Sequence, residues 1–166
     1  MRIPIRWNAH AEVQSPYTID PAFSERIDWV IEKALSCGLV TIINIHYYDA
    51  LMERPEDHHA RFRVLWRQIA EHCQALDSNP YFELLNEPHD DLEGALWNSY
   101  LADALTVVRE SNPDRIVAIG PDSWNDLSEL PRLEIPEDDR RLIVAFHYYD
   151  PFRFTHKGAE WVEGAD

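Results

Sequence analysis

Runs of consecutive apolar residues alternate along this chain with stretches in which apolar residues recur every three or four positions. The run Leu39–His46 is typical of a strand buried on both faces. Such alternation predicts β–α units around a parallel sheet, so the expected fold class is α/β. Five strands are expected, over residues 2–7, 39–46, 81–87, 115–120 and 142–147.

The helical stretches carry start and stop signals. Asp20 and Pro21 form an N-cap followed by a first-turn proline, and Gly38 ends the periodic stretch between them. A loop over residues 47–55 leads into a second helix, whose apolar stripe is Phe62, Leu65, Trp66, Ile69 and Cys73. Ser78–Pro80 is expected to be a turn, and a third helix is expected over residues 93–110. Residues 121–141 read as irregular with a helical turn near 127–130, and residues 152–166 as a long loop. At 166 residues, one domain covering 1–166 is expected.

Charge and composition exclude some partners. The net charge of -15 argues against nucleic acid and anionic membrane surfaces and suits a neutral ligand. No signal peptide is recognised, and no run is long enough to span a membrane. Two cysteines, Cys37 and Cys73, imply no disulfide framework, and both are predicted to be buried thiols. Six Trp and seven Tyr usually mean core, but a sugar-binding groove also needs flat apolar platforms.

Polar side chains with chemical capability stand where three of the strands end. His46 ends one strand, Asn86 and Glu87 end another, and His147 ends the last. A single strand-end histidine is most often structural. In a parallel barrel, however, all three ends meet on the face where active sites are built.

Length alone does not favour a closed barrel, since five strands are fewer than eight and a complete barrel takes about 250 residues. An open doubly wound sheet fits 166 residues better. Yet no glycine-rich phosphate loop follows the first strand, as dinucleotide-binding or P-loop versions of that sheet would require.

Four motifs in order resemble glycoside hydrolase family 5, the (β/α)8 family of endoglucanases and mannanases. They are Arg-Ile-Pro-Ile at 2–5, Asn-Ile-His-Tyr-Tyr at 44–48, Phe-Glu-Leu-Leu-Asn-Glu-Pro-His at 82–89, and the stretch 146–161. The resemblance covers the whole chain. It implies a partial (β/α)8 TIM barrel comprising about strands two to six, with the first strand and the last two missing.

The resemblance also implies roles for particular residues. Glu87 is similar to the general acid/base and Asn86 to the residue that binds the sugar 2-hydroxyl. Pro88 is expected to restrict Glu87 to extended geometry. A semi-buried rim beside a second carboxylate is expected to keep the Glu87 carboxyl protonated until it donates. Arg2 is similar to the arginine that holds the nucleophile's carboxylate. The other substrate-binding residues that the resemblance implies are His46, Tyr47, His147, Tyr149, His156 and Trp161. Tyr47 stands where close relatives often carry a second histidine.

One part of the catalytic pair has no match. In the family the nucleophile lies on the seventh strand, after the last motif, and here Glu160, Glu163 and Asp166 are the carboxylates that remain. None of them follows a predicted strand. The chain is therefore expected to be the central part of a longer enzyme, inactive by itself, with two open sheet edges.

The function expected is retaining endo-hydrolysis of β-1,4-glucan, with a β-1,4-linked poly- or oligosaccharide as partner and no metal or cofactor. Endo-β-1,4-mannanase or dual activity, or a non-catalytic carbohydrate-binding fragment, are the alternatives. A metal-dependent hydrolase is a further alternative, prompted by His46, His147, His58, His59 and His89–Asp91. It is not favoured, because His58 and His59 are adjacent on a helix and the two strand-end histidines lack a nearby carboxylate cluster. The complete enzyme is expected to be secreted or periplasmic.

Overall fold

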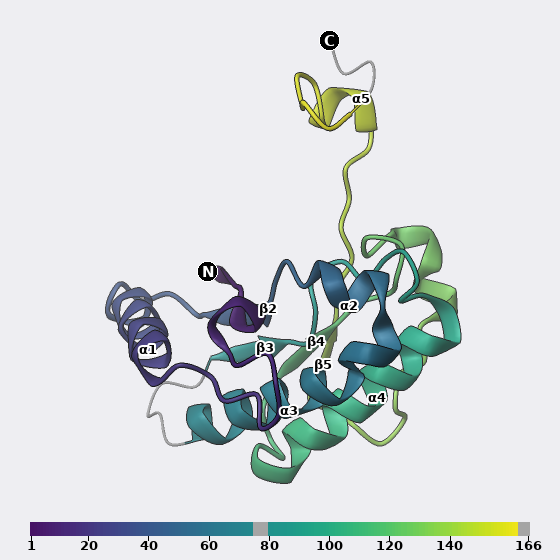
Figure 1. Cartoon of the computed structure of the whole chain (residues 1–166). Helices are drawn as coiled ribbons and strands as arrows, with labels where there is room; N and C mark the ends of the chain where they lie inside the picture. Colours follow the sequence, from purple (N-terminus) through teal and green to yellow (C-terminus); the bar gives the residue numbers. More distant parts are fainter. Residues whose placement is uncertain (75–79, 163–166) are drawn as a thin grey trace.

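Strands and helices alternate through residues 1–74 and 80–162, the parts of the chain that the computed structural model describes (Figure 1). The strands are β1 (Arg2–Ile5), β2 (Ile42–Ile45), β3 (Tyr81–Glu83), β4 (Val117–Ile119) and β5 (Leu142–Val144). The α-helices are α1 (Pro21–Ser36), α2 (Asp49–Glu53), α3 (Pro55–Gln74), α4 (Gly94–Ser111) and α5 (Phe152–Thr155). Two 3-10 helices, η1 (Trp7–His10) and η2 (Leu127–Arg132), lie in connections.

The order of the strands in the sheet is their order in the chain, and every neighbouring pair is parallel. A doubly wound sheet would reverse this order at a switch point. Because successive right-handed crossovers here all proceed in one direction, they place their helices on one face of the sheet, as in a barrel. The predicted α/β class is confirmed, and the order is that of part of a barrel.

Lateral register separates two faces of the sheet. Ile3, Ile43, Phe82 and Val117 form one row and are buried, and Phe82 packs against Trp66 of α3 with ring centroids 5.4 Å apart. The next row, which we call the inner face, comprises Pro4, Asn44, Glu83, Ala118 and Ile143. The helix-covered face is therefore apolar, while the inner face carries polar groups.

Two tryptophans tie helices to the carboxyl ends of the strands. The indole N–H of Trp66 donates to the carbonyl of Leu84 at 3.0 Å, and that of Trp97 on α4 donates to Gly120 at 2.9 Å. Both indoles are buried, and their hydrogen bonds satisfy groups that would otherwise be costly to desolvate. These contacts hold the backbone in place at Leu84, two residues before Asn86, and at Gly120, directly after β4.

The helix signals in the sequence are confirmed. The carboxylate of Asp20 accepts from the amide of Ala22 at 2.9 Å, and Pro21 occupies the first position of α1. On α3, the predicted apolar stripe of Phe62, Leu65, Trp66, Ile69 and Cys73 is buried.

The strand predictions were too long at several ends. β1 stops at Ile5, and Trp7 begins η1 instead of continuing the strand. β2 begins only at Ile42, so Leu39 and Val40 are exposed. The cause is the pairing itself, since β2 pairs with β1 over only the four residues that β1 provides.

Other expectations need correction. The predicted loop 47–55 contains α2, and the predicted loop after residue 151 begins with α5. Cys37 is exposed because it lies at the residue that ends α1, while only Cys73 is buried. Parts of two expectations, the turn at Ser78 and Asn79 and the carboxylates Glu163 and Asp166, lie outside the described residues.

Beyond β5 the chain leaves the sheet. Residues 148–162, which we call the arm, extend away from the other helices and carry α5 at some distance from them (Figure 1). On β5 itself, Ile143 and Val144 are exposed by 43% and 41%. Within the described residues, β1 and β5 are therefore edge strands, and β5 is the more weakly covered of the two.

Candidate active site

The carboxyl ends of the strands supply the polar side chains of one pocket. His46 directly follows β2, Asn86 and Glu87 follow β3 after a short bend, and His147 follows β5. Since the strands are parallel, these ends lie on one edge of the sheet. The predicted convergence of the three strand ends is confirmed.

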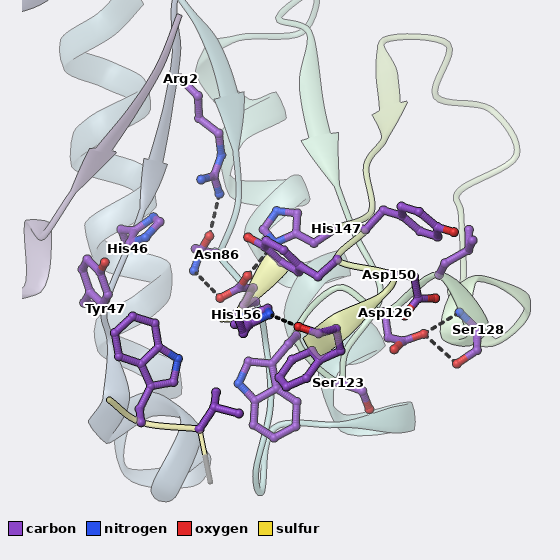
Figure 2. Close-up of a pocket in the computed structure, with 18 residues that line it drawn as sticks. Arg2, His46, Tyr47, Asn86, Ser123, Asp126, Ser128, His147, Asp150 and His156 are labelled. Carbon is purple, nitrogen blue, oxygen red and sulfur yellow. Dashed lines mark hydrogen bonds and ion pairs between the residues drawn. The ribbon is translucent and has the colours of Figure 1, made fainter. Parts of the chain in front are cut away.

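An open pocket of about 1140 Å³ lies between this edge and the arm (Figure 2). All nine residues proposed from the sequence line it, namely Arg2, His46, Tyr47, Asn86, Glu87, His147, Tyr149, His156 and Trp161. Their individual roles remain predictions. The pocket also has carboxylates from Asp126 and Asp150 and an indole from Trp124 in its wall.

Glu87 is held by two neighbours. His147 Nδ1 lies 2.6 Å from Glu87 Oε1, and the amide of Asn86 donates to Oε2 at 3.2 Å. Burial by itself would raise the pKa of Glu87, but the hydrogen bond and charge of His147 outweigh it, with help from Asn86. The net result is a pKa of Glu87 below its ordinary value, so the carboxylate form is favoured.

This environment bears on two expectations about Glu87. A semi-buried rim beside a second carboxylate was expected to keep the carboxyl protonated. Among the described residues its partner is His147 and not a second carboxylate, and this contact stabilises the ionised form. The following proline was expected to hold Glu87 in extended geometry, yet its φ is +48°. A residue before proline avoids the right-handed helical region, and here the left-handed region is the alternative adopted. The carbonyl of Glu87 is bonded to His89 Nδ1 at 2.5 Å in this conformation.

Arg2 reaches from β1 to β3. Its Nε donates to Glu83 Oε2 at 2.5 Å, and its second guanidinium nitrogen donates to Asn86 Oδ1 at 2.7 Å (Figure 2). Arg2 was expected to hold the nucleophile's carboxylate. The carboxylate that it binds among the described residues is Glu83, which sequence reasoning had left without a role.

His46 is buried, and its neutral form is favoured. Burial, followed by the charge of Arg2, lowers the pKa of His46. Its Nδ1 lies 3.2 Å from the amide nitrogen of Asn44, a wholly buried residue of β2. Tyr47, next along the chain, has a φ of +54° and is more than half exposed, so its ring is presented to the pocket.

The opposite wall is aromatic and belongs largely to the arm. Tyr149 makes an edge contact with His156 at a centroid distance of 5.0 Å, and Phe152 stacks on His156 at 4.0 Å. Trp161 is 82% exposed, although it lines the pocket. Flat apolar surface therefore stands free on this side of the pocket.

Several residues of the site were missed in the sequence. Trp124 lines the pocket, stacks on His89 with centroids 4.9 Å apart and is 56% exposed. The strand expected before it, over residues 115–120, ends in Gly120 and not in a polar residue, so Trp124 was not recognised. Asn44 and Glu83 could have been found by parity, since Asn44 lies two residues before His46 and therefore shares its face of the strand.

Besides Glu87, the carboxylates that line the pocket among the described residues are Asp126 and Asp150. Asp126 accepts from the amide and hydroxyl of Ser128, both at 2.7 Å, and so caps η2. These hydrogen bonds lower the pKa of Asp126. Asp150 lies at the start of the arm, and Glu160 is exposed and does not line the pocket.

Metal-binding geometry does not arise in the described part of the chain, where no three His, Cys, Asp or Glu side chains are placed to hold an ion. The histidines weighed for such a site are engaged elsewhere: His58 with Tyr48, His59 with Asp103, and His89 with Trp124. No helix within residues 1–74 and 80–162 has the length and apolarity needed to cross a membrane.

Comparison with known proteins gives a consistent picture. A family model described as cellulase (glycosyl hydrolase family 5) matches residues 1–166. Endoglucanase H of Acetivibrio thermocellus is 43% identical over 157 residues, which are 95% of this chain and 17% of that protein. Endoglucanase B of Ruminococcus albus is 32% identical over 172 residues, covering 93% of this chain and 42% of that protein.

Solved structures share the fold closely. Thermotoga maritima Cel5A in complex with mannotriose superimposes with a TM-score of 0.95 at 46% identity, over 99% of this chain and 53% of that one. The same enzyme has also been solved with cellobiose. The chain thus spans about half of these structures, and less than half of the two curated relatives named above.

Proposed function

The chain belongs to glycosyl hydrolase family 5, and from this premise we propose that its pocket is part of the catalytic cleft of a retaining endo-β-1,4-glucanase. One observation supports this above the others. Glu87 lies at the rim of an open pocket, bonded to His147 and Asn86, with aromatic rings on the facing wall. The names of the curated relatives, endoglucanases H and B, favour glucan as the substrate.

Glu87 is proposed as the general acid/base. In the first step it donates its proton to the glycosidic oxygen while a second carboxylate attacks the anomeric carbon; in the second it removes a proton from the water that releases the sugar. The lowered pKa of Glu87 suits the second step. A second carboxylate placed about 5 Å away would raise that pKa and supply the protonated form that the first step needs.

Asn86 and His147 are proposed to hold Glu87 and the sugar together. The Asn86 amide lies beside the carboxylate, where it can also bond a 2-hydroxyl as positive charge develops on the sugar ring. Tyr47, Trp124 and Trp161 offer exposed rings on which pyranose faces can stack. Because these contacts need no charge on the ligand, they suit a neutral glucan.

The second carboxylate is proposed to come from a strand that these 166 residues do not contain. Asp126 is occupied by the cap of η2, and Asp150 and Glu160 lie on the arm, away from strand ends. We therefore expect the 166-residue protein to cleave neither cellohexaose nor soluble cellulose derivatives by itself. Measurable release of reducing sugar, abolished by Glu87→Gln, would overturn this expectation.

A chimera tests the role of Glu87 directly. Residues 1–166 would replace the matching half of Thermotoga maritima Cel5A, which supplies the rest of a barrel. The chimera should hydrolyse cellohexaose, and Glu87→Gln should lower kcat by about 10²- to 10⁴-fold. An activated aryl cellobioside, whose leaving group needs no proton, should still release its aryl group in a burst.

The matched control is Glu110→Gln, which removes a carboxylate of a surface ion pair with Arg67. This variant should retain full activity. If Glu87→Gln is equally active, the assignment of the acid/base is wrong. An inactive parent chimera would instead contradict the proposed hydrolase function of these 166 residues, provided circular dichroism confirms that it is folded.

Mannan is the second candidate substrate, favoured because a 46%-identical neighbour has been solved with mannotriose. Comparing kcat/KM of the chimera for cellohexaose and mannohexaose separates the two. The binding-only alternative rests on the exposed Trp161. It predicts that the 166-residue protein binds cellohexaose in calorimetry, that Trp161→Ala abolishes binding, and that the folded chimera cleaves nothing.

A further inference from the structure

Glu83 is a buried carboxylate to which the pocket's polar residues connect, and sequence reasoning had given it no role. It is the last residue of β3, lies on the inner face and is 5% exposed. One oxygen, Oε2, accepts from Arg2 Nε at 2.5 Å and from Asn44 Nδ2 at 3.0 Å. A carboxylate accepts and cannot donate, so it dictates that both neighbours turn N–H groups towards it.

The first branch leads to Glu87. With Nε bound to Glu83, the guanidinium of Arg2 donates a second time to Asn86 Oδ1 at 2.7 Å. The oxygen of Asn86 is thereby engaged, which leaves its NH₂ group to donate to Glu87 Oε2 at 3.2 Å. Because a guanidinium has no acceptor, Arg2 itself sets the direction of the Asn86 bond, and Glu83 acts on this branch by holding Arg2 in place. The bonds from Arg2 to Asn86 and from Asn86 to Glu87 are drawn in Figure 2.

The second branch leads to His46. The NH₂ group of Asn44 faces Glu83 with one hydrogen and lies 3.2 Å from His46 Nδ1 with the other. In that arrangement Nδ1 must accept, so the proton of the neutral imidazole sits on Nε2. This orientation of the Asn44 amide has an energetic cost, because Asn44 Oδ1 is buried with no hydrogen-bond partner among the described residues. A turned amide would bring two oxygens together at Glu83, which explains why this orientation persists.

We propose that Glu83 is a positioning residue for this network: it holds the guanidinium of Arg2 that turns the Asn86 amide towards Glu87, and through Asn44 it fixes the proton of His46 on Nε2. The proposal deepens the proposed function and rests on it for the roles of Asn86 and Glu87. The state of His46 is a property of the 166-residue chain itself, however, and does not require hydrolysis.

The test is the tautomer of His46, read by long-range ¹H–¹⁵N correlation NMR on the 166-residue protein above the pKa of its imidazole. His46→Phe assigns the signals by their loss. In the unaltered protein Nδ1 should show the shift of an unprotonated nitrogen and Nε2 that of a protonated one. A proton on Nδ1 would overturn the proposal before any Glu83 variant is made.

Two variants then test the cause. In Glu83→Leu nothing at this position accepts from Asn44, so Asn44 can turn its oxygen towards His46, and the Nδ1–H tautomer should rise from a minor to a major fraction. Glu83→Gln can keep its carbonyl oxygen at the position that Arg2 and Asn44 share, so it should retain the Nε2–H form. If His46 stays fully Nε2–H in a folded Glu83→Leu protein, Glu83 does not set the direction.

Asp139→Asn is the matched control for loss of an ion pair. Asp139 pairs with Arg109 at 2.8 Å, with side chains 15% and 19% exposed, and has no bond to the pocket. It should leave the His46 spectrum unchanged while lowering stability as Glu83→Leu does. A tautomer shift in this control as well would mean that general loosening, and not Glu83, moves the proton, which contradicts the proposal.

Discussion

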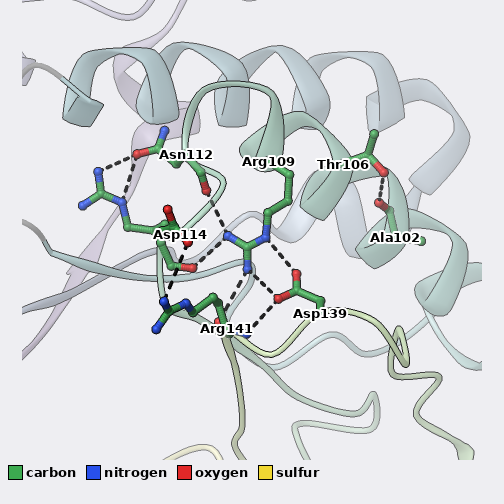
Figure 3. Close-up of polar contacts among 8 residues, drawn as sticks. Ala102, Thr106, Arg109, Asn112, Asp114, Asp139 and Arg141 are labelled. Atoms are coloured by element: carbon green, nitrogen blue, oxygen red, sulfur yellow. Dashed lines mark hydrogen bonds and ion pairs between the residues drawn. The ribbon is translucent and has the colours of Figure 1, made fainter.

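Two arginine networks lie towards opposite ends of the same sheet, and they lead to different places. Towards the carboxyl ends, Arg2 binds the side chains of Glu83 and Asn86. Towards the amino ends, Arg115 donates to the backbone carbonyls of Pro80 and Cys73 and to the side chain of Asn112. Arg109 likewise donates to carbonyls of Asn112 and Arg115, with Asp139 as its carboxylate partner (Figure 3).

We call the Arg115 network, which holds the amino-end backbone in place, the clamp. We call the network from Arg2 through Asn86 to Glu87 the relay. At the amino ends, the arginines bind backbone carbonyls, and their side-chain partners Asn112 and Asp139 bond in turn to backbone groups. The Arg2 network instead runs through Asn86 to a carboxylate in an open pocket. An arginine network by itself therefore does not mark a functional site, whereas the group at which it ends does.

Backbone strain follows the same division. Within the described residues, all seven non-glycine residues at positive φ lie in loops after the carboxyl ends of β1 to β4: Tyr17, Tyr47, Glu87, Asp90, Ser123, Trp124 and Asn125. Each costs of order 1 kcal/mol, which folded structure must offset. The amino-end loops have only Gly38 at positive φ among these residues. Strain concentrates where the pocket is built.

Removing the clamp should have the largest effect on stability. Arg115→Met leaves the carbonyls of Pro80 and Cys73 and the side chain of Asn112 with one donor fewer in a buried site, so the free energy of unfolding should fall by about 3 kcal/mol. Urea unfolding measures the loss. The Glu87–His147 contact, followed by NMR, should not change while the protein is folded.

The thiol of Cys73 provides an independent readout of this clamp. Burial raises the pKa of Cys73 to about 12, so it should resist alkylation until the amino-end region opens, while exposed Cys37 reacts at once. Arg115→Met should speed the labelling of Cys73 and leave that of Cys37 alone. Equal labelling of Cys73 before and after the change would show that Arg115 does not hold this region.

A methyl group added at Gly120 should disturb the pocket end. A Cβ there would lie 2.2 Å from Asn125 Nδ2 and 2.9 Å from the carbonyl of Ala145. Since the carbonyl of Asn125 accepts from the amide of His147 at 2.9 Å, displacement of Asn125 should reach His147. Gly120→Ala should cost about 1–3 kcal/mol of unfolding free energy and shift the NMR signals of His147.

Gly38→Ala applies the same chemical change to an amino-end loop. Gly38 has a φ of +75° and open space around its Cβ position, so only backbone strain is added. Stability should fall by about 1 kcal/mol, with the signals of His147 unchanged. A larger loss at Gly38 than at Gly120 would contradict the steric account of Gly120.

Local signals in the sequence predicted the elements well and their contacts poorly. The Asp20–Pro21 cap and the apolar stripe of α3 depend on near neighbours in the chain, so they could be found. The barrel order came from the resemblance to family 5, because apolar runs do not state which strands pair. Strand-end polarity found Glu87 and its neighbours, yet the contact of Arg2 with Glu83 spans 81 positions and depends on sheet register.

Conformation at the strand ends was equally hidden from the sequence. Proline after Glu87 predicts extended geometry, and the left-handed turn observed there coincides with bonds to His89 and His147. Trp124 enters the pocket on three consecutive left-handed residues, for which the sequence offers no glycine as a signal. Such strained turns depend on tertiary packing, so a local sequence pattern does not predict them.

Arg2→Lys should separate charge from geometry in the relay. Lysine keeps the positive charge near Glu83 but lacks the planar fork that serves Glu83 and Asn86 together. Because the Arg2 side chain is one-third exposed, stability should fall by only about 1 kcal/mol. In the Cel5A chimera, kcat should fall while KM stays within a factor of about two; an unchanged kcat would mean that the orientation of Asn86 does not need the fork.

His147→Gln should have the smallest effect on stability and the clearest effect on titration. His147 lowers the pKa of Glu87 against the opposing effect of burial, so its removal should raise that pKa, as ¹³C NMR of the carboxyl group would measure. A lowered pKa stabilises the fold above the ordinary glutamate pKa, and that stabilisation is lost as the pH falls through the lowered value. The variant should therefore be less stable than the unaltered protein at pH 6 and should approach it in stability under acid. A Glu87 pKa that stays low without His147 would assign the effect to Asn86 and the other neighbours, and would remove His147 from the group that controls the acid.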